Sequence, residues 1–358
     1  MNAAPVRVLV VDDSDTARGL ICALIAQDPR LTVCGEAADG RAAVAQAQRL
    51  LPAIITMDLR MPVLDGYGAI AEIMDRCATR ILVVSDCADA AHAMAAVAGG
   101  ALDATFKPGL DDGRAFTDRL WLLSGVPVIR HLRARADTGG RAGHATGPAP
   151  AAGANHAPAQ AGGAVIAIAS STGGPQALAR LLPALPAGLN APVLIAQHIS
   201  DGFAAGMAQW LAALCPLPVT LAREGELLRP GHIYLADSAT DLTLVPGRSL
   251  QLCPRASSEI YRPSCDRLLC SVAAVVGRRS IGVILTGMGR DGARGIAAIA
   301  AAGGTTVAQD EGTSVVFGMN REAIATGGVQ RVLPLEAIAA ELVRLVGCAP
   351  AFVRGRSA

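Results

Sequence analysis

Short runs of apolar residues alternate with alanine-rich stretches along both halves of the chain. Because the runs are continuous rather than alternating with polar residues, they are typical of parallel strands buried on both faces. The helical patterns between them indicate βαβ units, so we predict an α/β protein with two doubly wound parallel sheets. The expected strands are Val6–Val11, Ala53–Met57, Ile81–Ser85, Ala104–Phe106, Ala164–Ala169, Pro192–Gln197, Ile281–Thr286 and Thr305–Gln309.

Residues 137–163 differ in composition from the segments on either side. Nineteen of these 27 residues are Ala, Gly or Pro. Such a segment buries too little apolar surface to offset the entropy of ordering it, and its three prolines and seven glycines argue against an alanine-rich helix. We therefore expect domains at 1–136 and 164–350, joined by a flexible linker at 137–163.

Composition narrows the function classes. The formal net charge is +1 and aromatic residues make up 3% of the chain, which argues against a nucleic-acid partner. No apolar run approaches the roughly 18 residues of a membrane span, so direct membrane insertion is not expected. The nine cysteines form no CxxC pair and no secretory signal is recognisable, so we expect buried, reduced thiols in a cytoplasmic protein.

Polar side chains follow the expected strands of the N-terminal half. If the strand order is 2-1-3-4-5, three carboxylates, a hydroxyl and an ammonium group meet at one sheet edge: Asp12, Asp13, Asp58, Ser85 and Lys107. Each acid alone is equally well read as a solvated loop residue. Together they suit Mg²⁺, and the metal with the only lysine of the chain would neutralise a phosphoryl group on one carboxylate.

A glycine-rich turn follows the first strand of the C-terminal half, in the order Ser170-Ser171-Thr172-Gly173-Gly174-Pro175. A serine at such a turn projects its hydroxyl beside backbone N–H groups that can hold an oxyanion. The alternative is a plain helix N-cap formed by Thr172 or a serine.

Two further groups follow neighbouring strands of the same half. His198 is a candidate base for Ser171, and Asp291 is a candidate orienter for that imidazole, in the chain order Ser–His–Asp. A structural role for His198 and a helix-capping role for Asp291 stay open at this point. A dinucleotide fingerprint, Gly287-x-Gly289-x-x-Gly292, is a further alternative, although the charge of Asp291 inside it would repel a pyrophosphate.

The N-terminal motif resembles the receiver domain of two-component response regulators over roughly residues 5–125. The resemblance implies a flavodoxin-like domain in which Asp58 accepts the phosphoryl group. It further implies Asp12 and Asp13, with Asp58, as Mg²⁺ partners, and Ser85 and Lys107 as switch groups. A histidine kinase of chemotaxis would be the phosphodonor.

The C-terminal half resembles the Rossmann-like catalytic domain of chemotaxis protein-glutamate methylesterases, over roughly residues 162–348. The motifs that carry this resemblance are Ser171–Gly174, Gln197-His198, Tyr261–Asp266, Gly287–Gly292 and Val315–Met319. It implies a catalytic triad of Ser171, His198 and Asp291. Backbone amides of Met288 and Thr172 would donate to the oxyanion, and this half would need no cofactor.

The resemblance also implies substrates and partners. Members of this family hydrolyse glutamyl methyl esters on the cytoplasmic helices of methyl-accepting chemoreceptors, and many deamidate receptor glutamines. A DNA-reading output is the alternative for a receiver protein. It would be a short helix-turn-helix module with clustered positive charge, whereas this half is long, strand-rich and not basic.

Three positions depart from the two families. Ala104 stands where receivers usually carry Tyr or Phe, while Phe106 directly precedes Lys107, which puts aromatic gating of the switch in question. In the C-terminal half Ser170 replaces a usual alanine, and Asn320 replaces a usual proline. Neither change removes a catalytic group, although both bear on the reach of the substrate.

Overall fold

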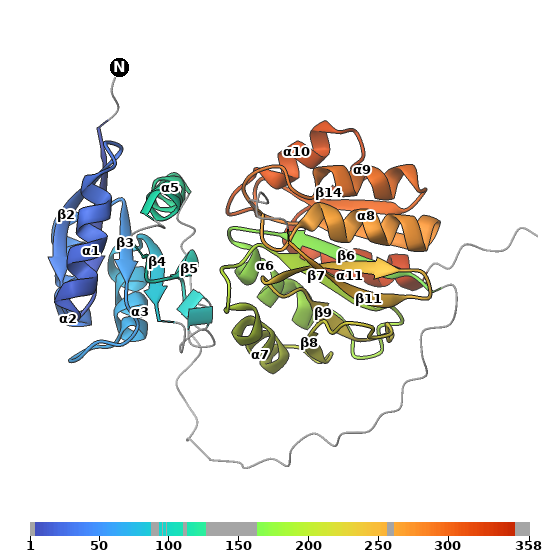
Figure 1. Ribbon diagram of the computed structural model, residues 1–358, viewed down its shortest axis with the longest axis horizontal. Coiled ribbons are helices and arrows are strands. Elements are labelled where there is room, and N and C mark those ends of the chain that lie inside the picture. Colours follow the sequence, from blue (N-terminus) through green and yellow to red (C-terminus); the bar gives the residue numbers. More distant parts are fainter. Residues whose placement is uncertain are drawn as a thin grey trace, which may run out of the picture.

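The structure is a computed structural model that describes residues 4–86, 93–94, 96–97, 99–109, 113–126, 163–255 and 261–347. It contains two α/β domains, each built on a central parallel sheet with helices on both faces (Figure 1). The predicted fold class is thereby confirmed. The linker expected at 137–163 lies outside the described residues except for Gly163.

The N-terminal domain has a five-stranded sheet in the predicted order, β2-β1-β3-β4-β5. All of its strand pairs are parallel. The strands are β1 (Val6–Val11), β2 (Leu31–Ala37), β3 (Ile54–Met57), β4 (Arg80–Ser85) and β5 (Asp103–Phe106), and the helices are α1 (Asp15–Ala26), α2 (Gly40–Leu50), α3 (Gly66–Cys77) and α5 (Gly113–Ser124).

Successive residues of each strand serve opposite faces of this sheet, as a period of two requires. Val8 and Val10 of β1 pack with α1 and α5, whereas Leu9 and Val11 pack with α2 and α3. Both sets are buried, which is why the strand reads as a continuous apolar run.

The C-terminal domain has a seven-stranded sheet in the order β14-β13-β12-β6-β7-β9-β8, and every strand pair is parallel. The four longest strands are the predicted ones. The set is β6 (Val165–Ser170), β7 (Val193–Gln197), β8 (Val219–Leu221), β9 (Ile233–Leu235), β12 (Ser280–Ile284), β13 (Thr305–Gln309) and β14 (Arg331–Leu333).

Helices cover both faces of the second sheet. Figure 1 shows α8, α9 and α10 on one side and α6 and α7 on the other, and the core clusters agree with this division. The elements are α6 (Gly174–Leu181), η3 (Leu182–Ala184), α7 (Ala204–Leu214), α8 (Cys265–Val276), η4 (Gly277–Arg279), α9 (Ala293–Ala301), α10 (Met319–Ala325) and α11 (Leu335–Gly347).

An antiparallel hairpin departs from the purely parallel prediction. β10 (Thr240–Val245) pairs with β11 (Ser249–Pro254) outside the main sheet. The expected strands are continuous apolar runs, whereas polar residues interrupt both β10 (Thr-Asp-Leu-Thr-Leu-Val) and β11 (Ser-Leu-Gln-Leu-Cys-Pro). The prediction also omitted β2 and the three-residue strands β8, β9 and β14. Thr32, Gly35 and Glu36 interrupt the apolar run of β2, and three residues carry no periodicity.

The two domains contact one another along β5, α5 and the neighbouring loops (Figure 1). The rings of Phe106 and Phe203 lie 4.2 Å apart. Gln176 at the start of α6 donates to the carbonyl of Ala101 at 2.8 Å. Arg119 of α5 donates to the hydroxyl of Ser200 at 3.1 Å. Aromatic packing and hydrogen bonds of side chains with the backbone thus join the domains.

Two further predictions concern the burial of the cysteine thiols and the absence of a membrane-spanning segment. The seven described cysteines are free, as expected, but only Cys265 is buried. The prediction of generally buried thiols was therefore wrong, because the other six described cysteines are partly exposed. Over the described ranges, no helix combines the length and the apolar character that crossing a bilayer requires.

Candidate active site and phosphoacceptor site

The C-terminal site lies where the strand order of the sheet reverses. β6 is followed by β7 on one side, while β12 and β13 extend the sheet on the other. Ser170 at the end of β6 is paired in register with Gln197 at the end of β7. Ser171 and His198 therefore follow neighbouring strand ends, at the switch point where open α/β sheets bind ligands.

The turn at Ser171 is set by its glycines. Gly173 has φ +77° and precedes α6 without any side-chain cap, so the helix-cap alternative is wrong for this serine. A Cβ atom at Gly174 would lie 1.9 Å from the Gln197 Oε1 atom, so only glycine fits there. The Ser171 amide donates to Thr286 at 3.0 Å, which fixes the backbone. Among the described groups the Ser171 hydroxyl has no hydrogen-bond partner.

His198 contacts the predicted acid directly. Its Nε2 atom lies 2.8 Å from Asp291 Oδ2. The Tyr261 ring stacks on the imidazole at 5.1 Å between centroids and 17° between planes. Because an ionised carboxylate only accepts hydrogen bonds, Nε2 carries the proton and donates it to Asp291. The ring nitrogen with a free lone pair is then Nδ1.

The carboxylate of Asp291 is almost fully buried, at 3% exposure. It accepts hydrogen bonds from the amides of Cys265 at 2.7 Å and Asp266 at 2.9 Å, which are the first residues of α8. Burial opposes ionisation, but the His198 ring and these amides outweigh it, so the pKa of Asp291 lies below its ordinary value. Asp291 therefore stays ionised at neutral pH.

Asp266 makes the reciprocal contact. Its Oδ1 atom accepts from the amides of Gly292 at 2.9 Å and Gly295 at 2.8 Å, at the start of α9. Its Oδ2 atom accepts from Arg294 at 2.8 Å. The acid beside each helix thus binds the free N-terminal amides of the other helix, and this cross-capping fixes the position of Asp291.

The loop at Met288 is anchored by a segment distant in sequence. The Gly287 amide donates to Val316 at 3.0 Å, and the Gly287 carbonyl accepts from Met319 at 2.8 Å. The hydroxyl of Thr286 donates to the carbonyl of Thr172 at 2.9 Å, so the two expected oxyanion loops are tied together. Thr286 is a residue whose positioning role sequence reasoning missed, although it ends an expected strand.

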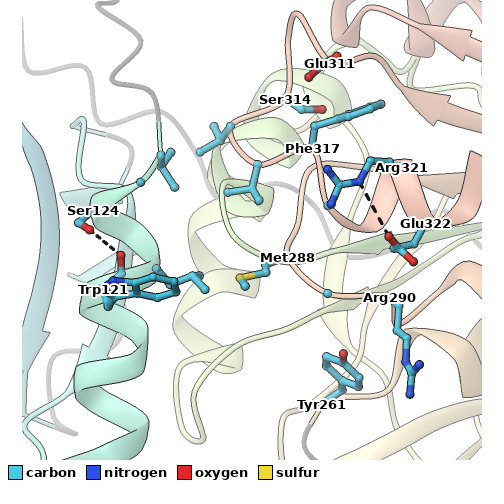
Figure 2. A pocket seen from close by; sticks show the side chains of 17 residues that line it. Trp121, Ser124, Tyr261, Met288, Arg290, Glu311, Ser314, Phe317, Arg321 and Glu322 are labelled. Atoms are coloured by element: carbon cyan, nitrogen blue, oxygen red, sulfur yellow. Dashed lines mark hydrogen bonds and ion pairs between the residues drawn. The ribbon is translucent and has the colours of Figure 1, made fainter. Parts of the chain in front are cut away.

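A cavity of about 910 Å³ opens beside this loop and is lined by both domains. Figure 2 shows Trp121 of α5 on one side, Met288 between the domains, and Tyr261 and Arg290 on the side of the C-terminal domain. Trp121 is 46% exposed and Met288 is 40% exposed. Apolar surface is therefore accessible next to the candidate catalytic groups.

Two departures from the family pattern are accommodated locally. Ser170 donates its hydroxyl to Gln197 Oε1 at 2.6 Å and is fully buried, so this hydroxyl is committed to Gln197. Asn320 is also buried and donates to the carbonyl of Gln309 at 2.7 Å. Both changes therefore act within the core.

The N-terminal site gathers the predicted groups around Lys107. Its Nζ atom lies 2.9 Å from Asp12 Oδ2 and 3.0 Å from Asp58 Oδ2. Burial disfavours the charge of Lys107, but these acids outweigh it and raise its pKa to about 12. Burial raises the pKa of Asp58 above its ordinary value, while Lys107 opposes that shift.

The donor set fits a magnesium ion. One oxygen from each of Asp12, Asp13 and Asp58 lies within 4.8 Å of the others. Mg²⁺ prefers such hard carboxylate oxygens. The hydroxyl of Ser85 is buried and has no hydrogen-bond partner in the described part of the chain. A phosphoryl oxygen would supply the missing partner.

The aromatic residue near Lys107 stands at another position of β5 than in the usual receiver pattern. Ala104 is buried in the core, whereas Phe106, two residues later on the same strand face, packs against Phe203 of the other domain. The aromatic contact next to Lys107 is thus made between domains.

Two family models match the chain. Residues 8–115 match the response regulator receiver domain, and residues 166–342 match the CheB methylesterase domain. These matches leave the dinucleotide and DNA-reading alternatives without support.

Similar proteins span nearly the whole chain. A protein-glutamate methylesterase/protein-glutamine glutaminase of Paramagnetospirillum magneticum is 48% identical and covers 96% of both chains. One from Myxococcus xanthus is 43% identical and covers 98% of this chain and 96% of its own. The solved CheB methylesterase catalytic domain of Thermotoga maritima is 36% identical and covers 51% of this chain and 98% of its own, with a TM-score of 0.50. The chain therefore belongs to the receiver-linked CheB family of protein-glutamate methylesterases/protein-glutamine glutaminases.

Proposed function

We propose that the chain hydrolyses glutamyl methyl esters on the cytoplasmic helices of methyl-accepting chemoreceptors, with Ser171, His198 and Asp291 as its catalytic residues. The observation that carries this proposal is the hydrogen bond of 2.8 Å between His198 and Asp291. His198 follows the strand that is paired with the one before Ser171. The catalytic residues belong to the domain that matches the methylesterase model.

The chemistry follows from the proton positions. Nδ1 of His198 accepts the proton of Ser171 while Nε2 keeps its hydrogen bond to Asp291, and the serine oxygen attacks the ester carbonyl. Backbone amides of Met288 and Thr172 stabilise the oxyanion. The imidazolium returns the proton to the departing methanol. Water then attacks the acyl-enzyme by the same route, which frees glutamate and Ser171. A receptor glutamine would release ammonia instead.

Asp266 is a positioning residue in this scheme. It touches no substrate, but its contacts with Gly292 and Gly295 hold the turn that carries Asp291. A shift of that turn would lengthen the bond from His198 to Asp291. The acid would then orient the ring and stabilise the imidazolium less well.

Phosphorylation acts through the receiver domain. A chemotaxis histidine kinase would donate the phosphoryl group to Asp58, with Asp12, Asp13 and Asp58 holding Mg²⁺. When bound, the ion would neutralise charge on the phosphoryl group. Lys107 would then turn from the carboxylates toward the phosphoryl oxygens, and Ser85 would donate its hydroxyl to one of them. We place these events in the cytoplasm.

Docking of the receiver domain on the C-terminal domain regulates the esterase activity. The unphosphorylated receiver covers the catalytic edge through Phe106, Arg119 and the contact with Gln176, and phosphorylation favours its release. The support is that Phe106 is covalently next to Lys107, so a change in the partners of Lys107 acts directly on the aromatic contact with Phe203.

Replacing the nucleophile tests the activity. Ser171→Ala should lower kcat for methanol release from methylated receptor fragments by about 10⁴- to 10⁶-fold, since the triad acts as a unit. An organophosphate probe should label Ser171 in the wild type and nothing in the variant. Near-normal turnover by Ser171→Ala would remove Ser171 from the nucleophile role.

Asp266→Ala tests the positioning role. It leaves the buried amide of Gly295 without an acceptor, which costs about 1–3 kcal/mol of stability, while the Gly292 amide keeps only its bond of 3.1 Å to Asp291. We expect lower kcat at similar KM and a changed pH profile of kcat/KM, with partial recovery in Asp266→Asn. Arg294→Gln is the matched control, because the Arg294 side chain is 83% exposed and such pairs contribute little. An unchanged rate and pH profile in Asp266→Ala would contradict the role.

Basal activity tests the docking. An aromatic pair contributes about 0.5–1.5 kcal/mol, so Phe106→Ala should raise the rate without phosphodonor about two- to tenfold. Arg41→Ala, which removes the salt bridge between α2 and α3, is the control.

A phosphodonor should activate the wild type and leave Asp58→Asn at its basal rate. Equal rates in all four combinations of protein and phosphodonor would exclude phosphorylation control.

Mg²⁺ should stabilise the receiver domain. At a concentration about ten times its Kd the ion adds about 1.4 kcal/mol to the free energy of unfolding. Thermal unfolding of the full chain followed by circular dichroism should show this for the wild type and lose it in Asp12→Asn. Glu72→Gln, on the outer salt bridge with Arg41, should behave as the wild type. Equal stabilisation of Asp12→Asn would place the ion elsewhere.

A further inference from the structure

One thiol lies against the catalytic pair without a role in the mechanism. Cys265 Sγ is 3.4 Å from Nε2 of His198, on the same ring nitrogen that donates to Asp291. Cys265 is fully buried, unlike the six other cysteines that the structure describes. Its pKa is raised well above the ordinary value by burial and by the nearby Asp291 charge, so it is a neutral thiol as the site stands.

Three metal-ligating atoms converge here. His198, Cys265 and Asp291 each offer one ligand atom, and these atoms lie within 4.8 Å of one another. Nε2 of His198 is 2.8 Å from Asp291 Oδ2 and 3.4 Å from Cys265 Sγ. Imidazole, thiolate and carboxylate are the ligands of zinc, at bond lengths of about 2.0–2.3 Å. In a tetrahedral centre such bonds separate ligand atoms by about 3.3–3.6 Å. The Sγ to Nε2 distance already suits this, and the His198 to Asp291 distance needs to widen by about half an ångström.

One of the three residues also borders a cavity and is already oriented. A cavity of about 570 Å³ is lined by Asp291 together with Tyr261 and Ser264, so solvent space comes next to this residue. The second oxygen of Asp291 is held by the amide of Asp266 at 2.9 Å, so the carboxylate is oriented before any ion arrives.

We propose that His198, Cys265 and Asp291 form a binding site for a borderline-soft divalent ion, of which Zn²⁺ is the representative, and that its occupancy inhibits the esterase. The sulfur ligand disfavours hard Mg²⁺, which is directed instead to the carboxylates of the receiver domain. The two domains thereby discriminate between two kinds of divalent ion.

Inhibition follows from the proton balance, and this part rests on the proposed esterase mechanism. An ion on Nε2 uses the lone pair of that atom, so the single ring proton moves to Nδ1. Cys265 binds as thiolate and releases its proton to solvent. With a proton on Nδ1, His198 has no lone pair with which to accept the proton of Ser171. The nucleophile therefore stays un-ionised while the metal is bound.

Metal titration of the full chain tests the site. After chelator treatment and removal of the chelator, ZnCl₂ should abolish methanol release at a stoichiometry of one ion per chain, whereas MgCl₂ should not inhibit. CoCl₂ should give a thiolate-to-cobalt absorption band in the near ultraviolet. Cys265→Val should need about tenfold more Zn²⁺ for half-inhibition, relative to its own metal-free rate, and should lose the band.

The control carries the same substitution on the same helix. Cys270→Val removes a half-buried thiol of α8 and should keep both the Zn²⁺ sensitivity and the cobalt band of the wild type. Should Cys265→Val not fold, Cys265→Ser preserves the volume while supplying a poor zinc ligand. Equal Zn²⁺ sensitivity of the Cys265 variant and the wild type, or a cobalt band that persists without Cys265, overturns the proposal. If no esterase turnover is found in the wild type, the cobalt band alone decides the site.

Discussion

A buried carboxylate that stays ionised underlies the whole catalytic edge. Asp291 has little access to water, so its charge persists only because the His198 ring and the first amides of α8 compensate for lost hydration. The first amides of a helix have no acceptor inside that helix, so they are free to donate to Asp291. In the same way, the Asp266 carboxylate accepts a hydrogen bond from the Gly292 amide at the start of α9. The helices α8 and α9 are thereby fixed against one another by Asp266 and by Asp291, the acid of the proposed triad.

The two halves of the chain use one architectural rule for different chemistry. In each, short loops after parallel strands bring together polar groups that lie far apart in sequence. In the receiver these are hard carboxylates around one ammonium group, suited to a magnesium ion and a phosphoryl group. In the esterase they are a hydroxyl, an imidazole and a carboxylate, with a thiol close by. The chemistry of each edge follows from which side chains end its strands.

The contact between the domains begins next to the phosphoacceptor site, which supports the proposed control by docking. Phe106 is adjacent in the chain to Lys107 and packs on Phe203, so the phosphoacceptor site and the domain interface share one short strand, β5. Ala104 leaves the usual aromatic position small and buried. In this chain the aromatic ring therefore serves the interface directly, and the cavity beside Met288 lies at the same junction (Figure 2).

The sequence by itself determined the fold class and the candidate residues at Asp58, Ser171, His198 and Asp291, because buried parallel strands and strand-end motifs are local patterns. The strand order of the receiver was a supposition there, which the structure confirms. It missed β2, the β10–β11 hairpin and the shortest strands, whose apolar patterns were interrupted or too brief. Only the tertiary structure decided that α8 and α9 cap one another across Asp266 and Asp291, that Nε2 rather than Nδ1 meets the acid, and that Cys265 touches the same ring. These relations join residues about 25 to 93 positions apart, and no periodicity along a chain encodes which free amide meets which carboxylate in three dimensions.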